Sequence, residues 1–153
     1  MVLYLFLTAA VVALDQVTKF LFYGKAATSI IGNFLWFEST LNTGIAFSIF
    51  SGKSMQIVLI VFSSIAALFM LMLVLSKAFL KNKPEKIMLA LILGGTIGNI
   101  IDRIAFGGVR DFIYLKFIDF AIFNVADMFI TITAIVLCIY VISHISKNKE
   151  EDD

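Results

Sequence analysis

The 153-residue sequence has little of what most soluble domains contain: one cysteine, one proline, one histidine and only 15% charged residues. The single cysteine, Cys138, excludes an intrachain disulfide framework and a cysteine zinc cluster. His144 has no second histidine with which to hold a metal. The formal net charge is only +1, so the basic field typical of nucleic-acid-binding proteins is absent. We therefore expect no metal, no cofactor and no nucleic-acid partner.

Apolar residues make up 61% of the sequence, and the mean hydropathy is +1.01. A soluble domain has about 45–50% apolar residues, so the composition indicates a single integral membrane domain over residues 1–153. A bilayer core about 30 Å thick needs about 20 helical residues. Four apolar runs qualify, at residues 2–23, 55–80, 87–106 and 124–145. The first run has no Lys or Arg before Asp15, which favours a spanning helix over a signal peptide.

Lysines indicate how these four runs are oriented. Lysines cluster in or beside the loop between the second and third runs, and two more follow the fourth run. Both clusters fall on one side of an even number of spans, so the positive-inside rule predicts cytoplasmic termini. The only proline, Pro84, lies in the polar segment 81–86, which predicts a hairpin loop.

The segment 28–53 differs in composition from a plain linker. Residues 34–41 have the β-branched and aromatic bias of a strand, 42–44 (Asn-Thr-Gly) are a turn signal, and 45–50 could pair back. Trp and Phe suit the headgroup level of a membrane. The predicted fold is therefore an all-α membrane protein with four transmembrane helices and a small extracytoplasmic β-sheet.

Carboxylates are the costly feature of so apolar a chain. Each costs about 2.5–3.5 kcal/mol at the centre of a spanning helix on insertion scales. In the predicted topology, every intramembrane or interfacial charge falls in the outer leaflet. Ion pairs that served packing alone would have no reason to gather there, so the clustering indicates a functional site. The polar residues concerned are Asp15, Lys19, Asn99, Asp102, Arg103, Asp111 and Asp127.

Two groups within this cluster have structural alternatives. Asp15 and Lys19, four residues apart, can neutralise each other on one helix or help to orient a substrate. Asn99, Asp102 and Arg103 share one helical face and can form an internal hydrogen-bonded cluster, or Arg103 can reach a lipid phosphate. We favour a supporting role for these three residues beside a catalytic site.

Spacing alone does not decide which two of the three later carboxylates, Asp111, Asp119 and Asp127, form a pair. We expect Asp119 to be a solvated residue of an interfacial loop. One alternative function is a small ion or proton transporter or channel subunit, which would place charges at several depths and often has repeated spans. Another is a non-catalytic membrane scaffold, which would tolerate loss of both aspartates. The charges here cluster on one side and no repeat is visible, so we favour an enzyme.

Five motifs in order resemble the lipoprotein signal peptidases (signal peptidase II), a family of bacterial intramembrane aspartyl endopeptidases. The resemblance covers essentially the whole chain. Each motif alone is modest, but the ordered set is highly specific. The motifs are Asp15-Gln16-Val17-Thr18-Lys19, Asn42-Thr43-Gly44-Ile45-Ala46-Phe47, Gly98-Asn99-Ile100-Ile101-Asp102-Arg103, Val109-Arg110-Asp111-Phe112-Ile113 and Phe123-Asn124-Val125-Ala126-Asp127.

The resemblance implies a four-helix membrane enzyme with a β-cradle and a half-helix loop on the outer side. Its reaction would be cleavage of the signal peptide of diacylglyceryl-modified prolipoproteins, just before the lipidated cysteine. Asp111 and Asp127 would be catalytic, without a metal or cofactor. The supporting residues implied are Asp15, Lys19, Asn42, Gly44, Gly98, Asn99, Arg103, Asn124 and Ala126.

The resemblance also implies partners and a location. The partners would be lipid-modified prolipoproteins, membrane lipids and globomycin-type inhibitors that occupy the aspartate site. We expect a monomer in the bacterial cytoplasmic (inner) membrane, with the active site toward the outer face.

The sequence departs from the family pattern in two places. Arg110 stands where the family usually has a small apolar residue before the aspartate, and we expect its side chain to face the headgroups. The segment 112–123 also differs from the loop associated with the family, which bears on lid shape and substrate preference.

Overall fold

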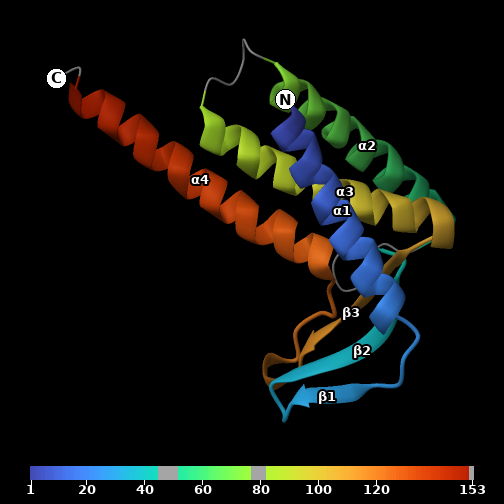
Figure 1. The fold of residues 1–153 in the computed structure, drawn as a ribbon. Coiled ribbons are helices and arrows are strands. Elements are labelled where there is room, and N and C mark those ends of the chain that lie inside the picture. The colour runs from blue at the N-terminus through green and yellow to red at the C-terminus, as the bar shows by residue number, and fades with distance from the viewer. Residues whose placement is uncertain (45–51, 77–81, 152–153) are drawn as a thin grey trace.

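The computed structural model describes residues 1–44, 52–76 and 82–151, and places four helices at one end and a small sheet at the other (Figure 1). The helices are α1 (Val2–Phe22), α2 (Lys53–Leu75), α3 (Lys83–Phe106) and α4 (Val125–Glu151). The strands are β1 (Thr28–Ile31), β2 (Leu35–Asn42) and β3 (Val109–Leu115), followed by a 3-10 turn, η2 (Lys116–Ile118). Both termini lie at the end of the molecule away from the sheet (Figure 1).

Each of the four helices is long and apolar enough to cross a membrane, with residues 125–144 as the apolar part of α4. The predicted fold class and the four predicted runs are therefore confirmed. Their boundaries differ most at three ends: α2 ends at Leu75 and not at 80, α3 begins at Lys83 and not after a loop over 81–86, and α4 continues to Glu151, beyond 145. Pro84 lies in the first turn of α3, where the missing N–H costs nothing because that group has no partner within the helix.

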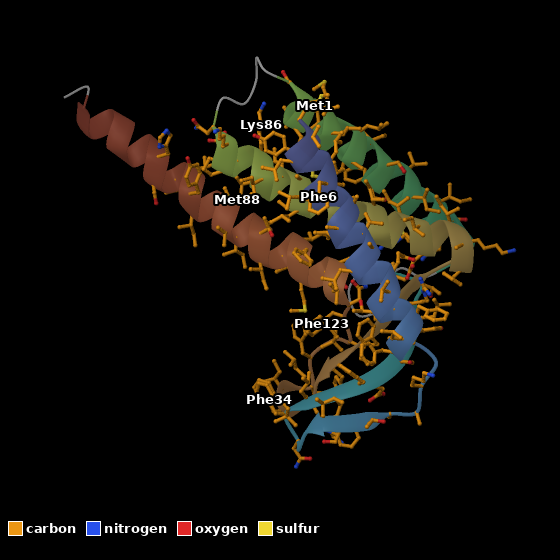
Figure 2. All side chains as sticks on the ribbon, viewed as in Figure 1. Met1, Phe6, Phe34, Lys86, Met88 and Phe123 are labelled. Carbon is orange, nitrogen blue, oxygen red and sulfur yellow. The ribbon has the colours of Figure 1, made fainter. Side chains whose placement is uncertain are left out.

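Helix α3 is the centre of the bundle and packs against the other three helices. Two glycines allow the close approach. A Cβ on Gly94 would lie 2.7 Å from Val11 Cβ of α1, and one on Gly95 would lie 2.7 Å from the Ala126 carbonyl oxygen of α4. The outward faces of the helices carry exposed apolar side chains such as Phe6, as expected of surfaces in contact with lipid (Figure 2).

The sheet has the order β1-β2-β3, with both pairs antiparallel. The strand predicted at 34–41 is confirmed as β2. The turn that joins β1 to β2 is at Gly32, which adopts a φ of +46°, and the predicted return strand 45–50 lies outside the described residues.

Strand β3 corrects one expectation for the segment after α3. We expected Asp111 to lie in an outer loop, but residues 109–115 pair with β2 in a register that places Asp111 opposite Thr40. The reason is local composition: Val109, Phe112, Ile113 and Tyr114 are β-branched or aromatic, and β2 offers them an edge. The only helical part is the three-residue turn η2.

Substitution of Gly95 by Ala should destabilise the bundle, because the added methyl group would overlap the α4 backbone and the side chain of Ile130. We expect a loss of about 1–3 kcal/mol, typical of overpacking, measured as a lower melting temperature in detergent. Ile104→Val on the same helix is the control, because Ile104 is 68% exposed. Equal melting temperatures for the two variants would contradict close α3–α4 packing.

Candidate active site

Asp111 and Asp127 come from different elements that the chain brings together at the sheet end of the bundle. Asp111 lies on β3 and is 1% exposed, and Asp127 lies in the first turn of α4. Phe123, which lies just before α4, joins the two elements. Phe123 exchanges backbone hydrogen bonds with Ile113, at 2.8 and 3.0 Å, and so holds the start of α4 beside β3 (Figure 1).

Asn124 is the N-cap of α4 and forms a reciprocal cap with Asp127. The Asn124 side-chain oxygen accepts a hydrogen bond from the Asp127 backbone N–H at 3.0 Å, and Asp127 Oδ2 accepts one from the Asn124 backbone N–H at 3.2 Å. This is the arrangement of a capping box, in which two free donors of the helix end are satisfied together. It also fixes the direction of the Asp127 carboxylate.

The side-chain amide of Asn124 reaches the other aspartate. Its Nδ2 donates to Asp111 Oδ1 at 2.6 Å and to Asn99 Oδ1 at 3.2 Å. Asn124 is completely buried. One buried residue therefore contacts both carboxylates, through its side chain on one and its backbone on the other.

A second buried amide, Asn99 of α3, holds Asp127 from the opposite side. Asn99 Nδ2 donates to Asp127 Oδ1 at 2.8 Å, while Asn99 Oδ1 accepts a hydrogen bond from Lys19 Nζ at 2.9 Å. The ammonium can only donate, so it determines which end of the amide faces the carboxylate. Lys19 also lies 2.8 Å from Asp15 and 3.4 Å from Asp102, and all three charged groups are fully buried.

The predicted Asp15–Lys19 pair is thus confirmed, and Asp15 has a further contact. Asp15 Oδ1 accepts a hydrogen bond from the backbone N–H of Ala126 at 3.0 Å, which satisfies a third free donor at the start of α4. Gly98 makes room for this carboxylate, because a Cβ there would lie 2.5 Å from Asp15 Oδ2. Gly98 and Ala126 therefore belong to the site through their small size and backbone position.

Both aspartates line a cavity of about 550 Å³ between the sheet and α4. Its polar lining also includes Asn42, Gly44 and Arg103, so the cavity brings five of the predicted site residues together. The remaining wall is mostly apolar and comes from α2, from β3, from the segment before α4 and from α4 itself. Its members include Leu59, Leu115, Phe120, Ile122, Phe123, Met128 and Ile132.

The surroundings of Asp111 favour its protonated form. Burial is the largest cause and the nearby Asp127 charge the second, and together they raise the pKa of Asp111 to about 7. Hydrogen bonds from Asn124 and Asn42 and the charge of Lys19 act in the opposite direction. Asp111 is therefore a carboxyl group that exchanges its proton near neutral pH, as a general acid or base requires.

The third outer carboxylate is separate from this pair. Asp119 is exposed, has a φ of +48° after η2, and accepts a hydrogen bond from the Tyr114 hydroxyl. The expectation that Asp119 is solvated is confirmed. The geometry thus separates Asp111 and Asp127 from Asp119, a choice that sequence spacing had left open.

Arg110 corrects another expectation, because its side chain does not face the headgroups. The residue is 8% exposed, its guanidinium lies 2.8 Å from Asp102, and it covers the ring of Phe106 at 4.1 Å.

Gln16, which also contacts Asp102, was not predicted as a site residue from the sequence. A polar residue next to Asp15 in an apolar run was the available signal.

Comparison with known proteins shows the family to which the chain belongs. The family model for signal peptidase (SPase) II matches residues 7–143. The chain belongs to the signal peptidase II family. The lipoprotein signal peptidase of Dehalococcoides mccartyi is 36% identical over 151 residues, which cover 95% of this chain and 93% of that protein. The one from Lactobacillus gasseri is 41% identical over 147 residues, which cover 92% of each chain.

Solved structures give the same result for the fold of this signal peptidase II family member. A bacterial membrane enzyme determined by the in meso method at 2.3 Å resolution superposes with a TM-score of 0.82 at 30% identity. The match covers 97% of this chain and 92% of that one. Family membership and the four apolar helices make the chain a peptidase of the bacterial inner membrane.

Asp127→Asn should lower the pKa of Asp111 from about 7 toward the ordinary value of 3.8, because it removes the neighbouring negative charge while leaving the burial. The titration can be followed by the carboxyl ¹³C shift of labelled aspartate in micelles, with Asp111→Asn identifying the signal. An unchanged midpoint in Asp127→Asn would contradict electrostatic coupling between the two groups.

Proposed function

We propose that this chain is an aspartyl endopeptidase that removes the signal peptide of diacylglyceryl-modified prolipoproteins, cutting immediately before the lipidated cysteine. Asp111 and Asp127 are the proposed catalytic pair. The observation that carries the proposal is their shared contact with Asn124 at the wall of one cavity. Relatives that match nearly the whole chain are lipoprotein signal peptidases, which supports the substrate class.

The proposed mechanism requires that the two carboxylates hold one proton between them, because two nearby negative charges in a buried site are costly. The ionised carboxylate removes a proton from a water molecule, and the oxygen of that water attacks the scissile carbonyl carbon. The protonated member donates its proton to the carbonyl oxygen. When the tetrahedral intermediate collapses, a proton passes to the leaving amine and the C–N bond breaks, with no covalent intermediate.

The cavity has both kinds of surface that a lipidated peptide needs. Its polar end, with Asn42 and Gly44 at the end of β2, can receive an extended backbone beside the carboxylates. Its apolar wall can receive hydrocarbon chains. Arg103 lines the cavity with a buried Nε that has no hydrogen-bond partner among the described residues, so we assign it to a peptide carbonyl or lipid phosphate.

We propose that both termini are cytoplasmic and that the site faces the outer side of the membrane. The lysine distribution supports this orientation, as does the position of both termini at the end opposite the sheet (Figure 1). We also propose that the enzyme acts as a monomer among membrane lipids and that globomycin-type inhibitors occupy the aspartate cavity. The transporter alternative is not favoured, because the family relatives are peptidases.

Asp111→Asn and Asp127→Asn should each reduce cleavage of a lipidated precursor by about 100- to 10,000-fold, because each removes a proton-transfer group. The assay is the appearance of the shortened product on a gel with purified enzyme. Asp119→Asn is the matched control, since it removes an exposed carboxylate of the same outer region, and it should cleave at the wild-type rate. Wild-type turnover in either catalytic variant would refute the assignment.

A further inference from the structure

Next to the aspartate pair lies a second group of polar side chains, the buried Asp102 of α3 and Arg110 of β3 and the half-buried Gln16 of α1. The guanidinium of Arg110 donates to both oxygens of Asp102, at 2.8 and 3.2 Å, and to Gln16 Oε1 at 2.9 Å. The Gln16 amide donates to Asp102 Oδ1 at 3.0 Å. This bidentate contact with a carboxylate requires the planar guanidinium of arginine, and the single ammonium of a lysine could not form it.

Arg110 immediately precedes Asp111, but its side chain lies on the other face of the strand. Successive side chains of a strand point to opposite faces, so the guanidinium meets Asp102 while the Asp111 carboxylate meets Asn124 and the cavity. The backbone N–H of Arg110 also donates to Asp102 Oδ2 at 2.9 Å. Among the described residues, the side chain therefore contacts neither aspartate of the pair, and it acts on the site through its two partners, Asp102 and Gln16.

Asp102 connects Arg110 to the ammonium that serves the catalytic site. Lys19 Nζ lies 3.4 Å from Asp102 and 2.8 Å from Asp15, and it donates to Asn99, which holds Asp127. With Arg110 present, two buried cations balance the two buried carboxylates. Without Arg110, Lys19 would be the one ion-pair partner that Asp15 and Asp102 share among the described residues, and one buried carboxylate would lose a cation of its own.

We propose that Arg110 is a positioning residue for catalysis: by neutralising Asp102, it leaves Lys19 able to hold Asn99, and through it Asp127, in the geometry of the pair. The inference rests on the proposed function. It predicts that loss of Arg110 harms turnover through an unbalanced charge and leaves substrate binding intact, because the guanidinium lies away from the cavity.

The test is steady-state cleavage of a lipidated precursor by purified Arg110→Met, Arg110→Lys and the double variant Arg110→Met/Asp102→Asn, with kcat and KM determined separately. Lys25→Met is the matched control, because it removes an exposed cation from the region between α1 and β1. Melting temperatures in the same detergent identify a variant that fails to fold.

For Arg110→Met we expect kcat to fall by about 10- to 100-fold, as for a small displacement of a catalytic group, with KM unchanged. The kcat of Arg110→Lys should lie between those of Arg110→Met and wild type, because lysine retains the positive charge but loses the bidentate contact with Asp102. The double variant should recover most of the lost kcat, since it removes the unbalanced carboxylate, and Lys25→Met should match wild type. The double variant also tests the proposal if Arg110→Met alone does not fold.

A wild-type kcat for Arg110→Met, a loss confined to KM, or a folded double variant no faster than Arg110→Met would each overturn the inference. Asp111→Asn and Asp127→Asn are assayed in parallel to separate this inference from the proposed function. If these two retain turnover, the proposed function fails. If they are inactive while Arg110→Met is fully active, only the role of Arg110 fails.

Discussion

The ammonium of Lys19 is the constraint on which the rest of the site depends. A buried charge costs several kcal/mol unless it is well paired, and Lys19 is fully buried with Asp15, Asp102 and Asn99 around it. These acceptors come from α1 and α3, so pairing the charge also fixes how the two helices meet. Because the ammonium engages the oxygen of Asn99, the amide nitrogen must face Asp127.

The interactions that start α4 are also those that orient the proposed catalytic groups. Asn124 and Asp127 cap each other, and Asp15 accepts the N–H of Ala126. Carboxylates at a helix N-terminus are favoured by its free donors and by its dipole. Folding therefore supplies a reason for the Asp127 carboxylate to be in this place before any substrate binds. The same contacts connect α4 to α1.

Much of this could be predicted from sequence because the signals were local. Long apolar runs predicted the four helices, and the topology that followed from the lysine distribution placed Asp15, Asp111 and Asp127 on one side of the membrane. The spacing of Asp15 and Lys19 predicted their ion pair. Each of these predictions used a property of one segment alone, or the side of the membrane on which that segment ends.

The rest depended on contacts between segments far apart in the chain. Residues 109–115 are rich in β-branched and aromatic residues, but they form a strand because β2 lies beside them, and no local pattern showed that these two segments would pair. Arg110 is buried because its guanidinium donates hydrogen bonds to Asp102 and Gln16. From the sequence, we had expected this arginine to face the headgroups. The separation of Asp119 from the pair likewise required the path of β3 and η2.

We propose that Asp111 and Asp127 function as one unit that holds a single proton. The most direct test is the pH dependence of kcat/KM for prolipoprotein cleavage by the wild-type enzyme. With the pKa of Asp111 raised to about 7, we expect a bell-shaped profile: activity appears as the first proton leaves the pair and falls around and above neutral pH as the second leaves. A rate that rises to a plateau and stays level into alkaline solution would contradict it.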